Sequence, residues 1–158
     1  LDKVGDTYHT SNTYNIVINP FGKENTSYIT QDYVKKLIND GPYNSIPRLL
    51  KYIHFHPEHK ENHNVKIPNK KQPYAQIYNG TAWEYQSKKE TINLMSDRAY
   101  SILNEHYEGY NGYMSKFKDD YDGNNIELTK RLSQDIEILI INNQINNKEY
   151  NKELSCND

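Results

Sequence analysis

The chain has 158 residues, which fits one domain with a buried core. Its formal net charge is −2 with acids and bases interspersed, which excludes a global positive field for nucleic acid or an anionic membrane and leaves only local contacts. Hydrophobic residues make up 35% of the chain, but 15 tyrosines can still fill a core with their rings, so the composition does not indicate disorder.

The N-terminal part of the chain predicts a polar lead-in and a first strand. Residues 1–13 are polar, and we expect them to precede a single domain over residues 14–143, with a flexible polar tail at 144–158. Tyr14 to Ile18 is rich in β-branched residues and is followed by Asn19-Pro20, a pair typical of turns. The pattern predicts a strand that ends at this turn.

Two short helices are predicted next. Thr30 is a suitable N-cap for a helix over residues 31–39, and Gly41 is a suitable stop. Ser45 is expected to cap a second helix, whose apolar face leads directly into His54.

A β-hairpin is the clearest short-range signal in the chain. Asn79-Gly80 separates two alternating stretches, 74–78 and 81–85, and this dipeptide favours a type I′ turn. Val65 to Ile67 predicts a further short strand. Together with the helices, these elements indicate an α+β fold, a small antiparallel sheet packed by several helices.

The second half of the chain is predominantly helical. Ser87 opens a capping box for a helix to about His106, and residues 109–112 interrupt it. Residues 119–125 have the composition of a charged linker. A last helix over 126–141 carries an apolar stripe that either packs on the domain or forms a short self-association seam, made by Leu132, Ile136, Leu139 and Asn143.

The densest group of reactive side chains lies in the loop at residues 53–65, which holds four of the six histidines. Zinc takes such residue types, namely His54, His56, His59 and His63 with Glu58 and Glu61. However, Pro57 indicates an irregular chain, and no cysteine pair completes a structural zinc site. We therefore predict no native metal site and no cofactor.

The same loop has features of an HNH-type nuclease. His54 would then be the general base that activates water, Asn62 would orient its ring, and a divalent ion would stabilise the leaving oxygen. Ile53 stands where such a site needs a metal ligand, and no metal-bearing helix follows Asn64. The alternative interpretation is structural, with His54 buried and bonded to the loop and the asparagines as turn residues.

The chain contains FGKENTSYIT at 21–30, the histidine loop with its flanks at 46–69, the hairpin YAQIYNGTAWEY at 74–85 and DIEILIINN at 135–143. In this succession it resembles an uncharacterised domain of giant DNA viruses, which is often found downstream of a C2H2 zinc finger or a coiled coil. The resemblance covers Phe21 to Asn143, and its most specific part is the IHF-x-P and E-N-x-N pattern of the histidine loop. His56 and Lys60 depart from it, because the family usually has asparagine and proline there. The resemblance implies a viral protein of the virus factory in the host cytoplasm, or of the nucleus.

The combined observations predict a non-enzymatic, intracellular module that is not secreted and does not bind membranes. The single cysteine, Cys156, agrees with a reducing compartment. The expected partner is nucleic acid or a protein bound to it, and the expected contact is the loop 53–65 with its surroundings. The candidate binding residues are His56, Glu61, His63, Asn64, Lys66, Lys70, Lys71 and Trp83. The alternatives are a divergent endonuclease that uses His54 and Asn62, and a homo-oligomer formed through residues 126–141.

Overall fold

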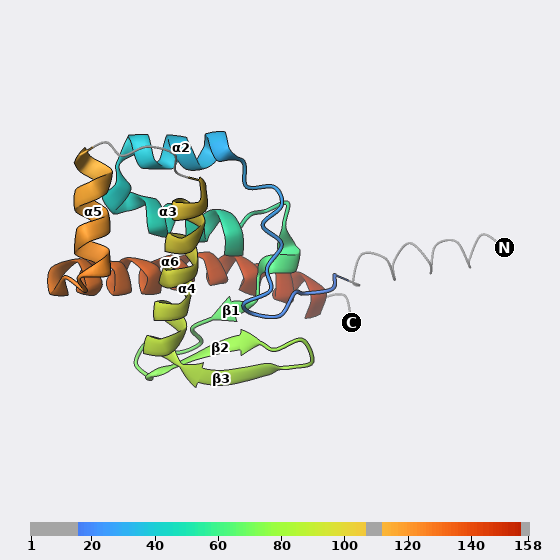
Figure 1. Ribbon diagram of the computed structural model, residues 1–158. Coiled ribbons are helices and arrows are strands. Elements are labelled where there is room, and N and C mark those ends of the chain that lie inside the picture. The colour runs from blue at the N-terminus through green and yellow to red at the C-terminus, as the bar shows by residue number, and fades with distance from the viewer. Residues whose placement is uncertain (1–15, 107–111, 156–158) are drawn as a thin grey trace.

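Helices and a small antiparallel sheet build an α+β fold, as the sequence predicts (Figure 1). The structure is a computed structural model that describes residues 16–106 and 112–155, so the lead-in 1–13 and Cys156 lie outside the described residues. The sheet lies along one side of the helices, and α2 lies at the opposite side. No helix in the described ranges has the length and apolar character needed to cross a membrane.

The first described helix, α2 (Gln31–Asp40), begins where the sequence predicts. The Thr30 side chain accepts a hydrogen bond from the Tyr33 N–H at 3.1 Å, which satisfies one of the free donors of the first turn. The helix ends at Gly41, whose φ of 138° lies in a region that other residues rarely adopt. Its apolar face is buried.

A short 3-10 turn, η1 (Pro42–Asn44), leads into α3 (Ser45–His54). The prediction that Ser45 caps this helix is wrong. Ser45 is its first residue, and its hydroxyl donates to the Pro42 carbonyl at 2.6 Å instead of accepting from the first turn. The reason is that the preceding residues already turn, so Ser45 holds the junction between two helical segments.

Three strands form the sheet in the order β1 (Val65–Lys66), β2 (Tyr74–Tyr78) and β3 (Trp83–Ser87). The predicted first strand is not formed, since residues 16–18 have no strand structure and Tyr14 lies outside the described residues. The following segment makes isolated backbone bonds, Asn19 N–H to Glu61 O and Phe21 N–H to Tyr78 O, each 2.7 Å long. Isolated bonds to two different elements do not make a ladder.

The hairpin exists, but its turn differs from the prediction. Tyr78 pairs with Trp83, so residues 79–82 form the connection and β3 runs over 83–87 instead of 81–85. Gly80 has a φ of 102°, whereas Asn79 is not among the positive-φ residues, as a type I′ turn would require. The Asn79 side chain instead accepts from the N–H groups of Thr81 and Ala82, at 2.8 and 2.9 Å. This local side-chain bonding replaces the tighter turn.

Three helices complete the domain. The helix α4 (Lys88–His106) follows the predicted capping box, and the Glu90 N–H donates to Ser87 Oγ at 3.3 Å. The helix α5 (Gly112–Asp122) was not predicted, and it includes residues that we assigned to a linker. The interruption expected at 109–112 falls outside the described residues except for Gly112.

The last helix, α6 (Ile126–Ser155), continues beyond the predicted end at Ile141. Its apolar stripe faces the core, with Leu132 only 4% and Ile136 0% exposed, so the seam considered for self-association packs inside its own domain. Gln144 is also buried, and its amide both donates to the Ile67 carbonyl (2.5 Å) and accepts from the Ile67 N–H (2.6 Å). Gln144 therefore belongs to the domain and not to the expected tail.

Candidate functional site

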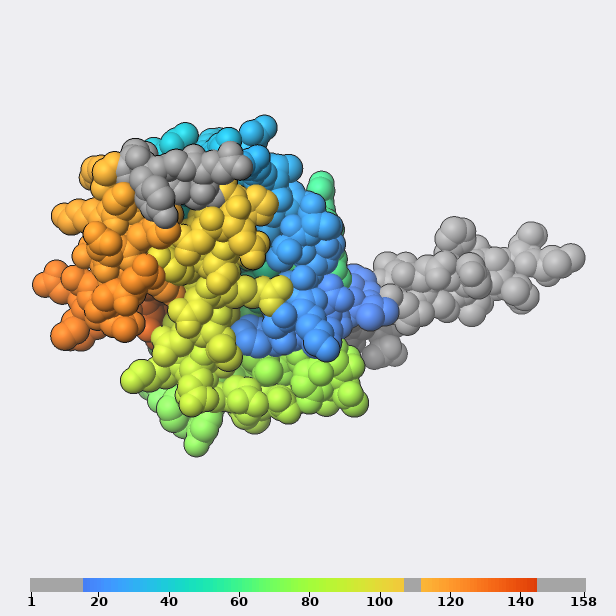
Figure 2. Space-filling view, in the orientation of Figure 1, coloured from blue at the N-terminus to red at the C-terminus, as the bar shows by residue number. Residues whose placement is uncertain are grey.

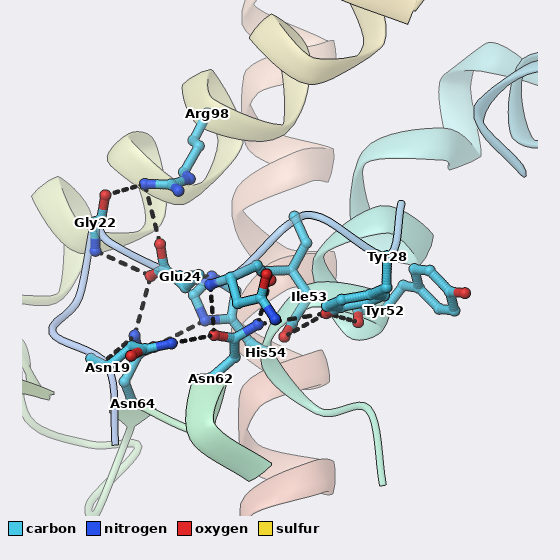
Figure 3. A network of polar contacts seen from close by, with 11 residues as sticks. Asn19, Gly22, Glu24, Tyr28, Tyr52, Ile53, His54, Asn62, Asn64 and Arg98 are labelled. Atoms are coloured by element: carbon cyan, nitrogen blue, oxygen red, sulfur yellow. Dashed lines mark hydrogen bonds and ion pairs between the residues drawn. The ribbon is translucent and has the colours of Figure 1, made fainter. Parts of the chain in front are cut away.

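The histidine loop is anchored by a buried polar cluster (Figure 3). It begins at the end of α3, passes through a 3-10 turn, η2 (Lys60–Asn62), and enters β1. The segment 16–30 crosses it, and in the space-filling view this blue segment lies against α4 in yellow and above the green β-hairpin (Figure 2). The cluster is made of side chains that are at most 7% exposed, namely Glu24, His54, Asn62 and Asn64.

Asn64 orients the ring of His54. Its Oδ1 lies 2.9 Å from His54 Nδ1, while its amide nitrogen donates to Glu24 Oε1 and to the Asn19 carbonyl, both at 3.1 Å. Because the amide nitrogen is the donor in these two bonds, Oδ1 is the acceptor, and His54 carries its proton on Nδ1. The remaining ring nitrogen, Nε2, faces Glu24 Oε1 at 3.8 Å.

The guanidinium of Arg98 and the backbone N–H of Gly22 stabilise the ionised form of the Glu24 side chain. Arg98 of α4 places Nη1 3.0 Å from Glu24 Oε2 and also donates to the Gly22 carbonyl, and the Gly22 N–H donates to Oε1 at 2.9 Å. Burial acts to raise the pKa of Glu24, but the backbone N–H of Gly22 and the guanidinium of Arg98 help to lower it below its usual 4.5. The cluster therefore contains a buried negative charge with a matched cation.

The structure does not support His54 as a nuclease base. Its ring is 1% exposed, and burial lowers its pKa below the usual 6.5 despite the neighbouring carboxylate of Glu24, so the ring is neutral. A general base has to reach the water that it activates, and this ring is closed off from solvent. Within residues 16–106 and 112–155, no three His, Cys, Asp or Glu side chains are grouped to hold a metal ion.

Asn62 has a different role from the one predicted. Its side chain accepts from the Asn25 N–H at 2.8 Å and donates to the Asn25 carbonyl at 2.7 Å, so the side chain binds the crossing segment, and only the backbone of Asn62 bonds to His54. It also accepts from Asn19 Nδ2 at 3.2 Å. The structural interpretation of the loop is thus the one that the geometry supports, with Asn64 in the orienting position.

The other polar residues of the loop are engaged within it. The ring of His59 stacks on Tyr28 with centroids 3.6 Å apart, and its Nδ1 lies 2.9 Å from Glu61 Oε1. His63 Nε2 lies 2.8 Å from the His56 carbonyl, and His56 Nδ1 accepts from the Glu58 N–H at 3.1 Å. These contacts satisfy the loop internally, so it is a rigid support more than a free binding surface.

Two of the remaining predicted residues, Lys66 and Trp83, meet on the sheet. Residues directly opposite in a ladder share a face, and side chains alternate along each strand. Lys66 is opposite Gln76, which is opposite Tyr85, and Tyr78 is opposite Trp83. The face that these five define with Tyr74 is called the aromatic face below. The opposite face carries Val65 and Ala75, both 0% exposed, and packs on the helices.

Contacts within the aromatic face are close. Lys66 Nζ lies 4.0 Å from the centroid of the Trp83 ring, and the Tyr78 and Trp83 centroids are 5.8 Å apart. Burial lowers the pKa of Lys66. Tyr74 and Tyr85 are 51% and 65% exposed, which makes them the most accessible rings of the sheet.

A shallow pocket of about 480 Å³ opens beside these two tyrosines. It is lined by Pro68, Asn69, Gln72, Tyr74 and Tyr85. Lys70 and Lys71 are exposed, and they lie in the same loop as the lining residues Pro68, Asn69 and Gln72. Two of the predicted lysines thus adjoin a pocket that the sequence analysis did not identify.

Comparison with known proteins places no further constraint on the site, since no protein family, no curated protein and no solved structure matches the chain. The resemblance to a giant-virus domain therefore stays a prediction. The candidate site rests on the geometry alone.

Proposed function

We propose that this protein is a non-enzymatic module that binds nucleic acid through its aromatic face and the adjoining loop 68–73. The proposal keeps Lys66, Lys70, Lys71 and Trp83 from the predicted binding residues. In this proposal the histidine loop is not part of the contact surface, and its role is to hold the sheet in position.

The observation that carries the proposal is the pairing of exposed rings with positive charge on one face. Tyr74 and Tyr85 are the exposed rings, and Lys66 lies on the same face, on the edge strand β1 next to the strand that carries Tyr74. Aromatic side chains stack on bases of any sequence, and lysines neutralise phosphates. Glu84, the acidic residue of β3, is opposite Ile77 and so points to the other face. The aromatic face is consequently free of acidic strand residues.

The buried cluster supports this face mechanically. β1 begins directly after Asn64, and the Asn64 carbonyl accepts from the Tyr78 N–H at 3.0 Å at the far end of β2. The side chain of the same residue is fixed by His54 and Glu24. The cluster therefore determines where β1 starts and how it meets β2.

The likeness to the giant-virus domain supports a natural setting in a virus factory or a nucleus, where nucleic acid is abundant. We include this setting in the proposal, because a nucleic-acid-binding module is expected in either compartment.

The test is a titration of the 158-residue protein with fluorescently labelled DNA and RNA, single-stranded and duplex, over a series of salt concentrations. We expect binding that weakens with salt. In the double variant Lys70→Glu/Lys71→Glu, affinity should fall by about tenfold or more, and the slope of log affinity against log salt should shrink by about 0.7 per lost phosphate contact on a single strand.

The matched control carries the same charge change elsewhere. Lys35→Glu/Lys36→Glu alters two exposed lysines of α2, on the other side of the helices from the sheet (Figure 1). It should bind almost as the wild type does. Equal losses of affinity in both double variants would show that only the net charge of the protein matters, which would contradict the proposal. A parallel gel with magnesium should show intact DNA, and cleavage that disappears in His54→Gln would overturn the non-enzymatic assignment.

A further inference from the structure

The pocket beside Tyr74 and Tyr85 has the size of a small-ligand site. Its volume of about 480 Å³ falls within the range of such sites, about 300 to 1,000 Å³. One planar base fits in this space. The pocket is shallow and open to solvent, so a strand can reach it from outside.

The walls of the pocket suit a flat aromatic guest. The rings of Tyr74 and Tyr85 meet edge to face, with centroids 6.3 Å apart and an angle of 73° between their planes. They do not stack on each other in parallel, and about half or more of each side chain is exposed. Ring surface is therefore left for a third planar group, and Pro68 adds an apolar wall of fixed backbone conformation.

The same pocket contains groups that can read the edge of a base. Asn69 Oδ1 accepts from the Lys71 N–H at 3.0 Å, which keeps the amide of Asn69 in place. Gln72 contributes a second amide, which offers both a donor and an acceptor. Such an amide can pair with the adjacent donor and acceptor of a base edge.

Positive charge lies next to the pocket along the chain. Lys70 and Lys71 are placed between Asn69 and Gln72, both of which line it. The loop is tied to the helices, because Lys88 Nζ donates to the Lys70 carbonyl at 3.1 Å and to Glu137 at 2.9 Å. The backbone of the loop is thus held in place, and its two lysines are close enough along the chain to reach phosphates that flank a bound base.

We infer that this pocket takes one unpaired nucleobase against the exposed ring surface of Tyr74 and Tyr85 and that the protein selects single-stranded over duplex nucleic acid. The inference rests on the proposed function and narrows it to a class of ligand. A base in a duplex already stacks on its neighbours, and its extraction costs free energy that a single strand does not require. Stacking on the aromatic rings therefore stabilises an unstacked base in the pocket.

The experiment compares three probes of equal length, a 12-nucleotide single strand, the matching duplex, and a 12-unit strand that has the sugar-phosphate backbone but no bases. We expect the tightest binding for the single strand. Tyr85→Ala should weaken that binding by about tenfold and should leave the baseless strand unaffected, since only stacking is removed. Tyr85→Phe should bind as the wild type does, because it keeps the ring.

Two further variants make the result specific. Tyr113→Ala removes a ring that is 71% exposed on α5, away from the sheet, and should not change binding. Gln72→Leu keeps the size of the side chain but removes its amide, so the ranking among strands of a single base type should change while the salt dependence stays the same.

The outcomes separate the inference from the proposed function. Equal affinity for the single strand and the baseless strand, with both weakened in Lys70→Glu/Lys71→Glu, would overturn the nucleobase pocket and leave nucleic-acid binding standing. Tighter binding of the duplex would do the same. No binding of any probe at low salt would overturn both. Circular dichroism of Tyr85→Ala checks that the fold is intact, which the exposure of this residue leads us to expect.

Discussion

His54 Nδ1 and Asn64 Oδ1 lie 2.9 Å apart and join the end of α3 to the start of β1 across the histidine loop. Both side chains are at most 1% exposed. The bond closes a loop of irregular chain around a neutral ring, and it explains how a segment with so many polar groups keeps one conformation. The loss of Asn64 should therefore destabilise the fold.

Asn64→Ala should lower the free energy of unfolding by about 2 to 3 kcal/mol, because it leaves His54 and Glu24 buried with lost partners. Chemical denaturation followed by circular dichroism measures the change. The control is Asn142→Ala, which truncates an exposed asparagine of α6 and should cost less than about 0.5 kcal/mol. A small effect of Asn64→Ala, equal to the control, would show that the bond to His54 does not hold the loop.

Stability should fall as the pH is lowered from 7 to 5. Burial lowers the pKa of His54 below 6.5 in the folded state, so below pH 6.5 the unfolded chain binds a proton that the folded chain does not. Each such group contributes at most about 1.4 kcal/mol per pH unit. The lowered pKa of Glu24 acts in the same direction below pH 4.5. Denaturation midpoints in a pH series give the slope, and His54→Gln should have a flatter one. An unchanged slope in that variant would contradict a buried neutral ring.

Arg98→Met should destabilise the fold by about 2 kcal/mol, because the Glu24 carboxylate remains buried without its cation. Arg48→Met is the matched control. Arg48 pairs with Asp40 at 3.3 Å, but the two side chains are 48% and 44% exposed, and exposed pairs contribute about 0 to 1 kcal/mol. Thermal unfolding of the two variants compares them directly. If both lose the same small amount, the Arg98 contact is an ordinary surface bridge.

Gly80→Ala should destabilise the hairpin by about 1 to 2 kcal/mol. Its φ of 102° is strained for any residue with a Cβ, and that atom would stand 3.1 Å from Pro20 Cγ. Gly112→Ala is the opposite case. Gly112 begins α5, and no heavy atom in the described part of the chain lies within 4 Å of a Cβ added there, so this variant should be slightly more stable than the wild type. Hydrogen exchange at the amides of β2 and β3 localises the effect of Gly80→Ala to the hairpin.

Local signals in the sequence were sufficient for most of the fold. Thr30 and Ser87 cap the helices that they were expected to cap, and the hairpin forms at the stretch that predicted it. Two of the failures have a common cause, which is local bonding that competes with the expected element. Asn79 bonds to its own turn, and Ser45 bonds back to Pro42. Periodicity does not reveal such bonds.

The candidate site was harder to predict, because its parts are distant in sequence. Glu24 and Arg98 were missed, and nothing in their neighbourhoods marks them, since each is one charge among many on a polar segment or an amphipathic helix. The aromatic face could have been found. Alternation along 74–78 and 83–87 places the rings on one side of the sheet, and a two-residue turn would give the same faces. The four-residue connection changes only which residues lie opposite each other.

Gln144 has a consequence for how these molecules behave in concentrated solution. A two-residue strand such as β1 leaves backbone groups at the margin of a sheet, where a second molecule can add its own strand and begin an aggregate. The amide of Gln144 engages both the N–H and the carbonyl of Ile67, as a neighbouring strand would. A single side chain thus occupies the backbone groups directly after β1, and a second molecule cannot extend its pairing along the chain past this short strand without displacing Gln144.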